Sequence, residues 1–473
     1  MASYKAAFIA DIHYFSPLLG TSGRAYELRS GSDQKCLAES GAVFDAAAEM
    51  LAGSGADCVC IAGDITNNGE KCSHDEMLAK LRTLREKRKV FLITSTHDWC
   101  SDGRSRRYEG EQVIRDVEMY TAPEVAEMYA PFGAGDELAS FRTAKGFASR
   151  VFRLSDHLRL IAVNDDCDGR GGKSGYSPEH LAWMKEQIKK AAEENAFVIA
   201  MEHHLIMPCI SPLVNSTQLI ADWQETSAEL ADAGLRLMFT GHSHMQRTTE
   251  FVSPAGNRIT QINLGSLCGY PAPVTFVTVD DSGKADVSVE FLDGFTYNGT
   301  RYGKEFFREH TSAVLYNLLN AAVADKNDLR DRLAADGIKI KNFDTVYPFI
   351  RAAAKKALSA TVGGAARVLN VLTFGKAVDK NDVKAVKNEK LLPHIIDDFL
   401  NCFDGSFISR SQEEAVKRIT VDVVGLPSRV VSHLPLGAEK KKKILGLTDA
   451  AADTARELEY PSAPDNMNCV IEL

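Results

Sequence analysis

The stretch Thr240-Gly241-His242-Ser243-His244 sets two histidines two residues apart, directly after the apolar run at residues 235–239. A short apolar run of this kind is typical of a buried strand, and the polar residues after it belong to a loop. His and Asp at a strand end do not contribute to apolar packing in a core, so this pattern indicates a functional site. Three upstream stretches share it: Asp11-Ile12-His13, Gly63-Asp64 and Thr96-His97-Asp98.

A further apolar run, residues 196–201, ends at Glu202-His203-His204. Neighbouring side chains in an extended segment point to opposite sides, so only one of the two histidines can face a shared site. We favour His203 and expect His204 to point away. The same alternation would let Asp11 and His13, two residues apart, face one site together.

Length and composition bound the class of protein. A chain of 473 residues is long enough for two or more domains, and 45% hydrophobic with 25% charged residues is typical of a globular protein. The net charge of −9 argues against broad nucleic-acid binding. None of the ten cysteines forms a CxxC pair, which favours a reducing compartment. We therefore expect a cytoplasmic protein without a leader or membrane span; the oligomeric state is not readable.

Strand-like and helical segments alternate along residues 1–300, which is the mark of layered α/β structure. From about residue 300 the periodicity becomes helical throughout. We therefore predict a catalytic domain at 1–300 and a mostly helical domain of unknown role at 301–473. Within the first, helices are expected at 33–52, from a Ser73–Glu76 capping box to 87, from a Ser177 cap to 195, and at 223–233.

The residue types at the strand ends suit a particular chemistry. Phosphate esters hydrolyse slowly because the attacking oxygen, the phosphoryl oxygens and the leaving group are all electron-rich. Two divalent cations overcome this by activating water and neutralising charge, and they need a shared carboxylate with imidazole and oxygen ligands. The chain offers such ligands in Asp11, His13, Asp64, His203, His242 and His244. Mn, Fe, Zn or Ni would suit this mixed set.

The order of these blocks resembles the calcineurin-like metallophosphoesterase family, whose pattern is D-x-H, G-D-x-x-[DN], G-N-H-[DE], a lone His, and G-H-x-H. The resemblance spans residues 4–291 and implies an α/β fold of two packed sheets flanked by helices. It implies that Asp11, His13 and His244 bind a first metal ion. Asp64 would bridge, and His203 and His242 would bind a second ion. His97 would contact the phosphate and assist the leaving group, and Asp98 would hydrogen-bond and orient His97.

One position departs from the family pattern. Thr96 stands where the family has an Asn that binds the second metal ion, and Ser95 replaces the preceding Gly. A hydroxyl is a poorer and shorter ligand than an amide oxygen. Either Thr96 binds the second ion directly, or it holds a water molecule that binds the ion, or the second site is weak. We predict that the second ion binds less tightly than the first.

The predicted function is a metal-dependent phosphohydrolase in which a metal-bound hydroxide attacks a small-molecule phosphoester. A phosphodiester such as a cyclic nucleotide is the first expectation, by family analogy. The alternatives are a phosphomonoesterase or protein phosphatase of the same fold, and a non-catalytic binding or scaffold protein, which the Thr96 departure supports. Nucleic acid and membranes are not expected partners.

Overall fold

The computed structural model describes residues 3–101, 103, 105–166, 169–335, 340–375, 377–404, 414–433, 438–460 and 467–473. The chain divides into two compact units. The first comprises Met1–Cys209, Thr217–Thr311 and Asp465–Leu473, and the second Ile210–Ser216 and Ser312–Pro464. Among the described residues, no helix is long and apolar enough to cross a lipid bilayer.

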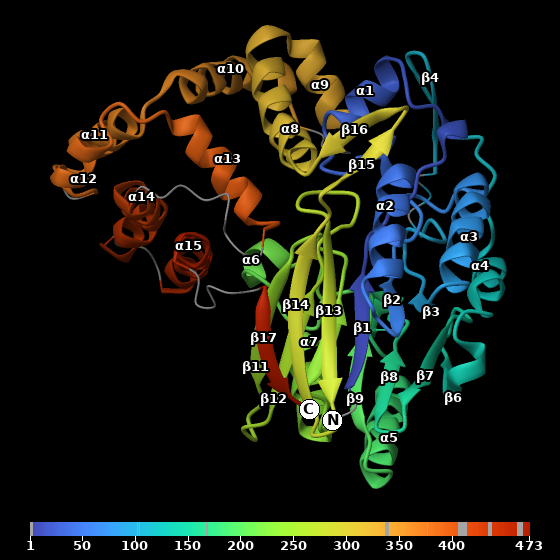
Figure 1. Cartoon of the computed structure of the whole chain (residues 1–473). Helices are drawn as coiled ribbons and strands as arrows, with labels where there is room; N and C mark the ends of the chain where they lie inside the picture. Colours follow the sequence, from blue (N-terminus) through green and yellow to red (C-terminus); the bar gives the residue numbers. More distant parts are fainter. Residues whose placement is uncertain are drawn as a thin grey trace. The chain divides into compact units, whose positions relative to one another are not determined.

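The first unit contains a six-stranded sheet in the order β17-β14-β13-β1-β2-β3 (Figure 1). Strands β1 (Ser3–Ile9), β2 (Cys58–Ala62) and β3 (Lys89–Ile93) run parallel. Antiparallel neighbours complete it: β13 (Pro273–Asp280), β14 (Lys284–Phe291) and β17 (Asn468–Glu472). The parallel strands therefore end at one edge of the sheet.

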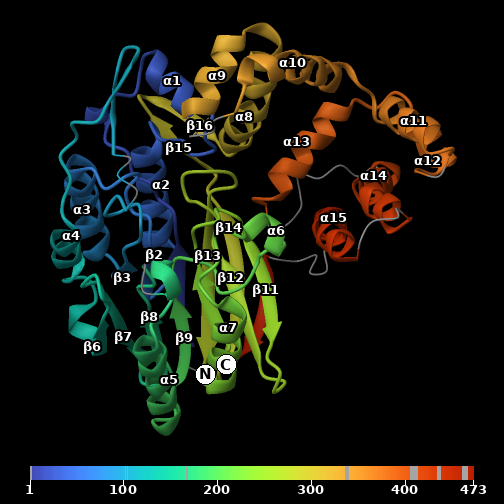
Figure 2. The same cartoon turned by 180° about the vertical axis from the view of Figure 1, so that it is seen from behind.

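A seven-stranded sheet follows the order β11-β12-β10-β9-β8-β7-β6 (Figure 2). Its parallel centre is β8 (Leu158–Ala162), β9 (Phe197–Met201), β10 (Leu237–Thr240) and β12 (Arg258–Asn263). The flanking strands β6 (Glu137–Arg142), β7 (Ala148–Ser155) and β11 (Arg247–Val252) are antiparallel to their neighbours. Two small ribbons, β4 (Arg107–Glu109) with β5 (Gln112–Ile114) and β15 (Gly294–Tyr297) with β16 (Thr300–Gly303), lie outside both sheets.

The two sheets pack face to face around one apolar core. Alternate residues of β1, β2, β9 and β10 enter this core, and the rings of Phe8 and Phe239 stack across it at 3.7 Å between centroids. A second core lies on the other face of the seven-stranded sheet, under α5 (Pro178–Glu193) and α7 (Trp223–Ala233). Helices α2 (Ser40–Gly53) and α3 (Lys71–Arg85) flank the six-stranded sheet (Figure 1). The expected α/β fold of two packed sheets flanked by helices is confirmed.

Two expected helix starts differ from the structure. Helix α2 begins at Ser40, and the segment from α1 (Arg24–Ser30) to Ser40 is a loop although residues 33–39 were predicted helical. Helix α3 begins at Lys71, so Ser73 lies inside it and is no cap. Ser73 and Glu76 instead bind outside the helix: Ser16 N donates to Ser73 Oγ at 3.2 Å, and the Tyr14 hydroxyl donates to Glu76 Oε2 at 2.8 Å. The Ser177 cap is confirmed, since its side chain accepts from His180 N.

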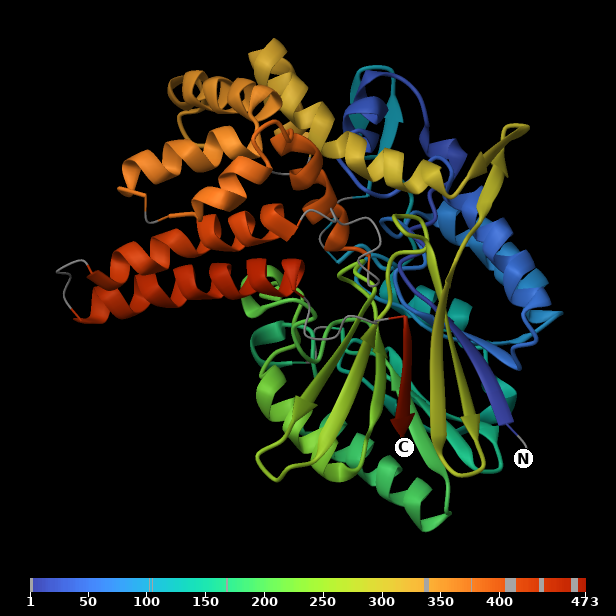
Figure 3. The same ribbon diagram turned by 60° about the vertical axis from the view of Figure 1, so that its left-hand side comes forward.

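The remaining helices of the first unit are short: α4 (Ala122–Tyr129) and the turns Pro17–Leu19, Ala134–Asp136 and Arg170–Gly172. The second unit is helical, and α14 and α15 lie side by side in it (Figure 3). It includes α6 (Pro212–Asn215), most of α8 (Glu305–Ala324), α9 (Lys326–Ala335), α10 (Phe343–Ser359), α11 (Val362–Leu372), α12 (Lys380–Ala385), α13 (Leu391–Asn401), α14 (Glu414–His433) and α15 (Ala438–Glu459). The sequence analysis expected helices here and did not anticipate strand β17, which belongs to the first unit.

Candidate metal centre

The loops after the parallel strands of both sheets meet at one edge of the sandwich. The loops after β1 and β2 run together, because Asp11 N donates to the Gly63 carbonyl at 3.2 Å and His13 N to the Asp64 carbonyl at 2.9 Å. The loops after β9 and β10 are joined in the same way, with Gly241 N donating to the His203 carbonyl at 2.9 Å. His242 N donates to Asp11 Oδ2 at 3.0 Å and so links the two pairs of loops.

The side chains at this edge project from an uncommon backbone conformation. Asp11 (φ 52°), His13 (φ 45°), Asp64 (φ 50°), His242 (φ 67°) and His244 (φ 60°) all lie in the left-handed region. Each such residue costs about 1–3 kcal/mol, and such residues cluster at functional sites. Asp11 and His13 were expected to face one site because side chains alternate along a strand, but β1 ends at Ile9, before both residues. The left-handed backbone, and not strand alternation, orients this pair and the pair His242 and His244.

Gly63 shows why this edge is tightly built. Its φ is 86°, and a Cβ at this position would come within 2.8 Å of His203 Nδ1. The close approach of the β2 loop to His203 therefore requires glycine before Asp64.

Asp11, His13 and His244 form the first cluster of ligand-type side chains. Asp11 Oδ1 lies 3.3 Å from His244 Nε2 and 3.6 Å from His13 Nε2, and the two Nε2 atoms are 2.9 Å apart. Asp11 and His13 are fully buried, whereas the His244 side chain is 16% exposed. Three donor atoms thus converge on one point that solvent can reach.

Asp64, His203 and His242 form the second cluster, with donor atoms within 4.8 Å of one another. Asp64 Oδ2 lies 3.1 Å from His203 Nε2 and 3.7 Å from His13 Nε2, so its carboxylate faces both clusters. His203 Nδ1 donates to the Ala62 carbonyl at 2.7 Å, which turns Nε2 toward Asp64.

The charges of the two carboxylates are stabilised by the histidines around them. Burial alone would raise the pKa of Asp11, but His244, His13 and His203 outweigh it and hold that pKa well below its usual range. Asp64 behaves likewise: burial raises its pKa, and His203 and His97 lower it further than burial raises it. Burial and Lys35 lower the pKa of His13, and burial and His204 lower that of His242. The two carboxylates thus keep their negative charge, while the rings of His13 and His242 stay neutral.

His203 carries the opposite tendency, and its cause is informative. Burial lowers its pKa, but the Asp64 and Asp11 carboxylates raise it well above the usual value. A proton on His203 and a divalent cation are alternative ways to balance Asp64, because metal ligation displaces such protons. Asp11 Oδ1 and His203 Nε2 are buried and have no hydrogen-bond partner among the described residues. Buried, unbonded donor atoms of carboxylate and imidazole type fit a pair of divalent cations.

His97 lies beside both clusters. Its backbone N donates to Asp64 Oδ1 at 3.2 Å, its Nδ1 donates to the Asn67 carbonyl, and its ring lies 4.9 Å from the His13 ring. The Asp98 carboxylate is buried and accepts from Ser95 N and Thr66 N, both at 2.8 Å. Asp98 therefore braces the turn that carries His97.

Thr96 precedes His97 in this turn and is partly exposed. Its carbonyl accepts from Ser101 N at 3.0 Å. No hydrogen bond of its hydroxyl is found among the described residues. The Thr96 side chain is thus not committed to another partner among the described residues.

Asp165, Asp166 and His204 form an adjoining cluster that was not predicted from the sequence. His204 Nδ1 donates to Asp165 Oδ2 at 3.0 Å, and its ring lies 4.3 Å from the His242 ring. Burial and the neighbouring Asp165 raise the pKa of Asp166 to about 7. The signal was present, because Asp165 and Asp166 follow the apolar run at residues 160–163 after a single polar residue, Asn164.

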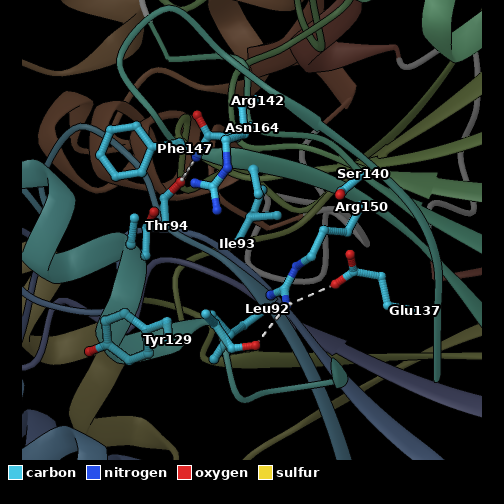
Figure 4. Close-up of a pocket in the computed structure, with 13 residues that line it drawn as sticks. Leu92, Ile93, Thr94, Tyr129, Glu137, Ser140, Arg142, Phe147, Arg150 and Asn164 are labelled. Atoms are coloured by element: carbon cyan, nitrogen blue, oxygen red, sulfur yellow. Dashed lines mark hydrogen bonds and ion pairs between the residues drawn. The ribbon is translucent and has the colours of Figure 1, made fainter. Parts of the chain in front are cut away.

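A separate cavity of about 130 Å³ lies beside the ends of β3 and β8 (Figure 4). Leu92, Ile93, Asn164 and the guanidinium groups of Arg142 and Arg150 line it. Arg150 Nη1 donates to the Ala130 carbonyl at 2.9 Å and lies 3.8 Å from Glu137 Oε2. None of the side chains of the two clusters lines this cavity, so it is not the site described above.

Residues 4–246 match the calcineurin-like phosphoesterase family. The match spans more than half of the 473 residues, so the chain belongs to that family and is a phosphoester hydrolase. No curated protein sequence matches the chain. Among solved structures, a dimetal phosphatase from Danio rerio is 12% identical, with a TM-score of 0.43, and the alignment covers 61% of this chain and 96% of that one. A second structure is 10% identical, with a TM-score of 0.33 and 62% and 100% covered.

Proposed function

We propose that the protein hydrolyses a small-molecule phosphodiester, such as a cyclic nucleotide, with two divalent cations. The observation that carries this proposal is the convergence of two buried donor atoms that have no hydrogen-bond partner among the described residues. These are Asp11 Oδ1 and His203 Nε2, which lie 3.9 Å apart beside the Asp64 carboxylate. Asp11, His13 and His244 would hold the first cation, and His203 and His242 the second. Asp64, which faces both groups, would bridge the two.

Such a pair of cations supplies positive charge to the phosphoryl oxygens and lowers the pKa of a bound water. The side chains of this protein have the other tasks. Asp11 and Asp64 keep their negative charge among the histidines and so would hold the cations at this buried edge. His97 Nδ1 donates to the Asn67 carbonyl, and a doubly protonated His97 ring would contact the phosphate through Nε2–H and give that proton to the leaving oxygen. Asp98 holds the turn that presents His97.

The choice of a diester over a monoester follows family analogy, and a phosphomonoesterase or protein phosphatase is the next candidate. The experiment is turnover of bis(p-nitrophenyl) phosphate beside p-nitrophenyl phosphate, with the full chain loaded with Mn²⁺. We expect a higher kcat/KM for the diester. A preference for the monoester would replace the diester proposal and leave the metal centre intact.

A non-catalytic role is the candidate from another class, and the position of Thr96 is the observation that favours it. A second ion held only by Asp64 and two imidazoles could be too weakly bound to act. The same assay separates the two functions, because a scaffold protein would bind Mn²⁺ without turning over either ester.

A further inference from the structure

Gln34 contacts the edge of the His244 ring that points away from the first cluster. Its side-chain amide lies against His244 Nδ1, in the loop between α1 and α2. The other nitrogen of the same ring, Nε2, lies 2.9 Å from His13 Nε2 and 3.3 Å from Asp11 Oδ1. Gln34 itself is only 9% exposed. The His244 ring therefore stands between a buried amide and the proposed first metal site.

The proton of a neutral imidazole decides what this amide must do. A ring nitrogen that binds a cation uses its lone pair, so the single proton sits on the other nitrogen. If Nε2 of His244 faces the cation, Nδ1–H needs an acceptor. Oε1 of Gln34 is buried without a hydrogen-bond partner among the described residues, and a half-turn of the amide brings it to Nδ1. One rotation satisfies both groups.

His203 and His97 show the same arrangement with backbone acceptors. His203 Nδ1 lies 2.7 Å from the Ala62 carbonyl, and His97 Nδ1 faces the Asn67 carbonyl. Carbonyl oxygens behind a ligating ring fix its tautomer and its orientation. Gln34 would give His244 this support from a side chain, which a substitution can remove.

The loop that carries Gln34 is held from several sides. Asp33 pairs with Arg29 and lies 3.4 Å from Lys35 Nζ, and its carbonyl lies 3.1 Å from His310 Nε2. Cys36 N donates to the Cys268 carbonyl at 2.7 Å. Gly269 follows directly, and a Cβ there would overlap the Gln34 amide. The amide is thus confined between an anchored loop and a residue without a side chain.

We propose that Gln34 is a positioning residue that accepts the Nδ1 proton of His244 and holds Nε2 toward a divalent cation at the first site. This inference rests on the proposed function, because His244 is a metal ligand only there. It concerns the first site alone, so the second site serves as an internal reference.

The test is calorimetric titration of the metal-stripped full chain with Mn²⁺. For Gln34→Leu we expect affinity at one site to fall about 10–100-fold, the usual effect of losing a partner behind a metal ligand, with the other site unchanged. Gln34→Glu keeps an acceptor and should retain the wild-type affinity. Gly269→Ala, which pushes the amide aside, should weaken the same site. Gln187→Leu, on α5, is the matched control and should change neither site.

A second measurement does not depend on any variant folding. In the Zn²⁺-loaded wild-type protein, long-range ¹H–¹⁵N spectra of ¹⁵N-histidine should show the His244 proton on Nδ1. A proton on Nε2 overturns the inference. So does Gln34→Leu with wild-type affinity at both sites, or Gln34→Glu as weak as Gln34→Leu, which would mean packing alone. Wild-type protein that binds no Mn²⁺ overturns the proposed function itself, a result distinct from the other three.

Discussion

The two halves of the candidate metal centre differ in the types of ligand side chain that they contain. The first half has a carboxylate of its own, Asp11, with His13 and His244 within 3.6 Å of it. The second half has two histidines and the carboxylate of Asp64, which also faces the first half. Thr96, at the position where the family pattern has Asn, would offer it a hydroxyl that is shorter than an amide. Negative charge holds a cation more strongly than neutral nitrogen does. The difference predicts a tight first site and a weaker second one.

Removing Asp64 should have the largest effect, because its carboxylate faces both halves. Asp64→Asn should lower kcat/KM for bis(p-nitrophenyl) phosphate by about 1,000-fold or more, which is roughly 4 kcal/mol of transition-state stabilisation. Steady-state rates with Mn²⁺ measure this, and Asp293→Asn, at an exposed carboxylate, is the control. Full activity in Asp64→Asn would refute the shared-carboxylate assignment.

The support behind the second half can be removed separately. Asp165 accepts from both the backbone N and Nδ1 of His204, whose ring packs against His242. Asp165→Asn should therefore weaken the second site about 10–30-fold and leave the first unchanged. Mn²⁺ titration measures both sites, with Asp156→Asn at an exposed position as the control. Equal weakening of both sites would show that this cluster supports the centre as a whole.

The proposed second site can be given the amide ligand of the family pattern by substituting Thr96. Thr96→Asn places an amide oxygen one atom further toward the second half and should tighten that site by about tenfold, or roughly 1.4 kcal/mol. The matched control is Thr83→Asn on the exposed face of α3. Two equally tight sites in the wild-type protein, counted by calorimetry, would remove the predicted inequality.

Lowering the pH should destabilise the fold at His74, which supports the turn that contains Asp98. His74 is buried between the Asp98 carbonyl and the Tyr129 hydroxyl, and burial lowers its pKa from 6.5 to about 4. A lowered histidine pKa leaves stability full above pH 6.5 and removes it as pH falls toward 4. Between pH 7 and pH 4, the free energy of unfolding of the wild-type protein should therefore fall by about 2–3 kcal/mol more than that of His74→Gln.

Urea unfolding at the two pH values measures this difference. His157→Gln, at an exposed position, should behave like the wild-type protein. An identical loss in the wild-type protein and in His74→Gln would mean that folding does not lower the pKa of His74.

The sequence allowed much of this centre to be predicted, because buried strands leave a strong apolar signal and the reactive side chains follow them immediately. Asp11, Asp64, His203 and His244 were all marked in this way. The conformation that joins them was not predictable, since left-handed backbone at Asp and His leaves no pattern in composition. The hydrogen bonds from Ser95 N and Thr66 N to the Asp98 carboxylate were not predictable for a similar reason, because adjacency in the sequence does not show which way a turn faces.

Elements held by distant partners were the hardest to predict. The periodicity of residues 33–52 favoured helix from the start, but ion pairs of Asp33 and the bond from Cys36 to Cys268 hold a loop there. Gln34 was invisible for the same reason, since its contact with His244 joins residues 210 positions apart. Strand β17 follows a long helical region and alternates only over five residues, too short a signal to stand out.

Strand β17 makes the catalytic sheet discontinuous in the chain. It pairs with β14 from Lys284–Glu472 to Ser288–Asn468, although the intervening stretch Ser312–Pro464 belongs to the second unit. An enzyme cut after residue 300 would present β14 as a bare sheet margin, open to pairing with other molecules. Expression of the phosphoesterase half by itself therefore invites aggregation, and a shortened version should splice residues 467–473 back on.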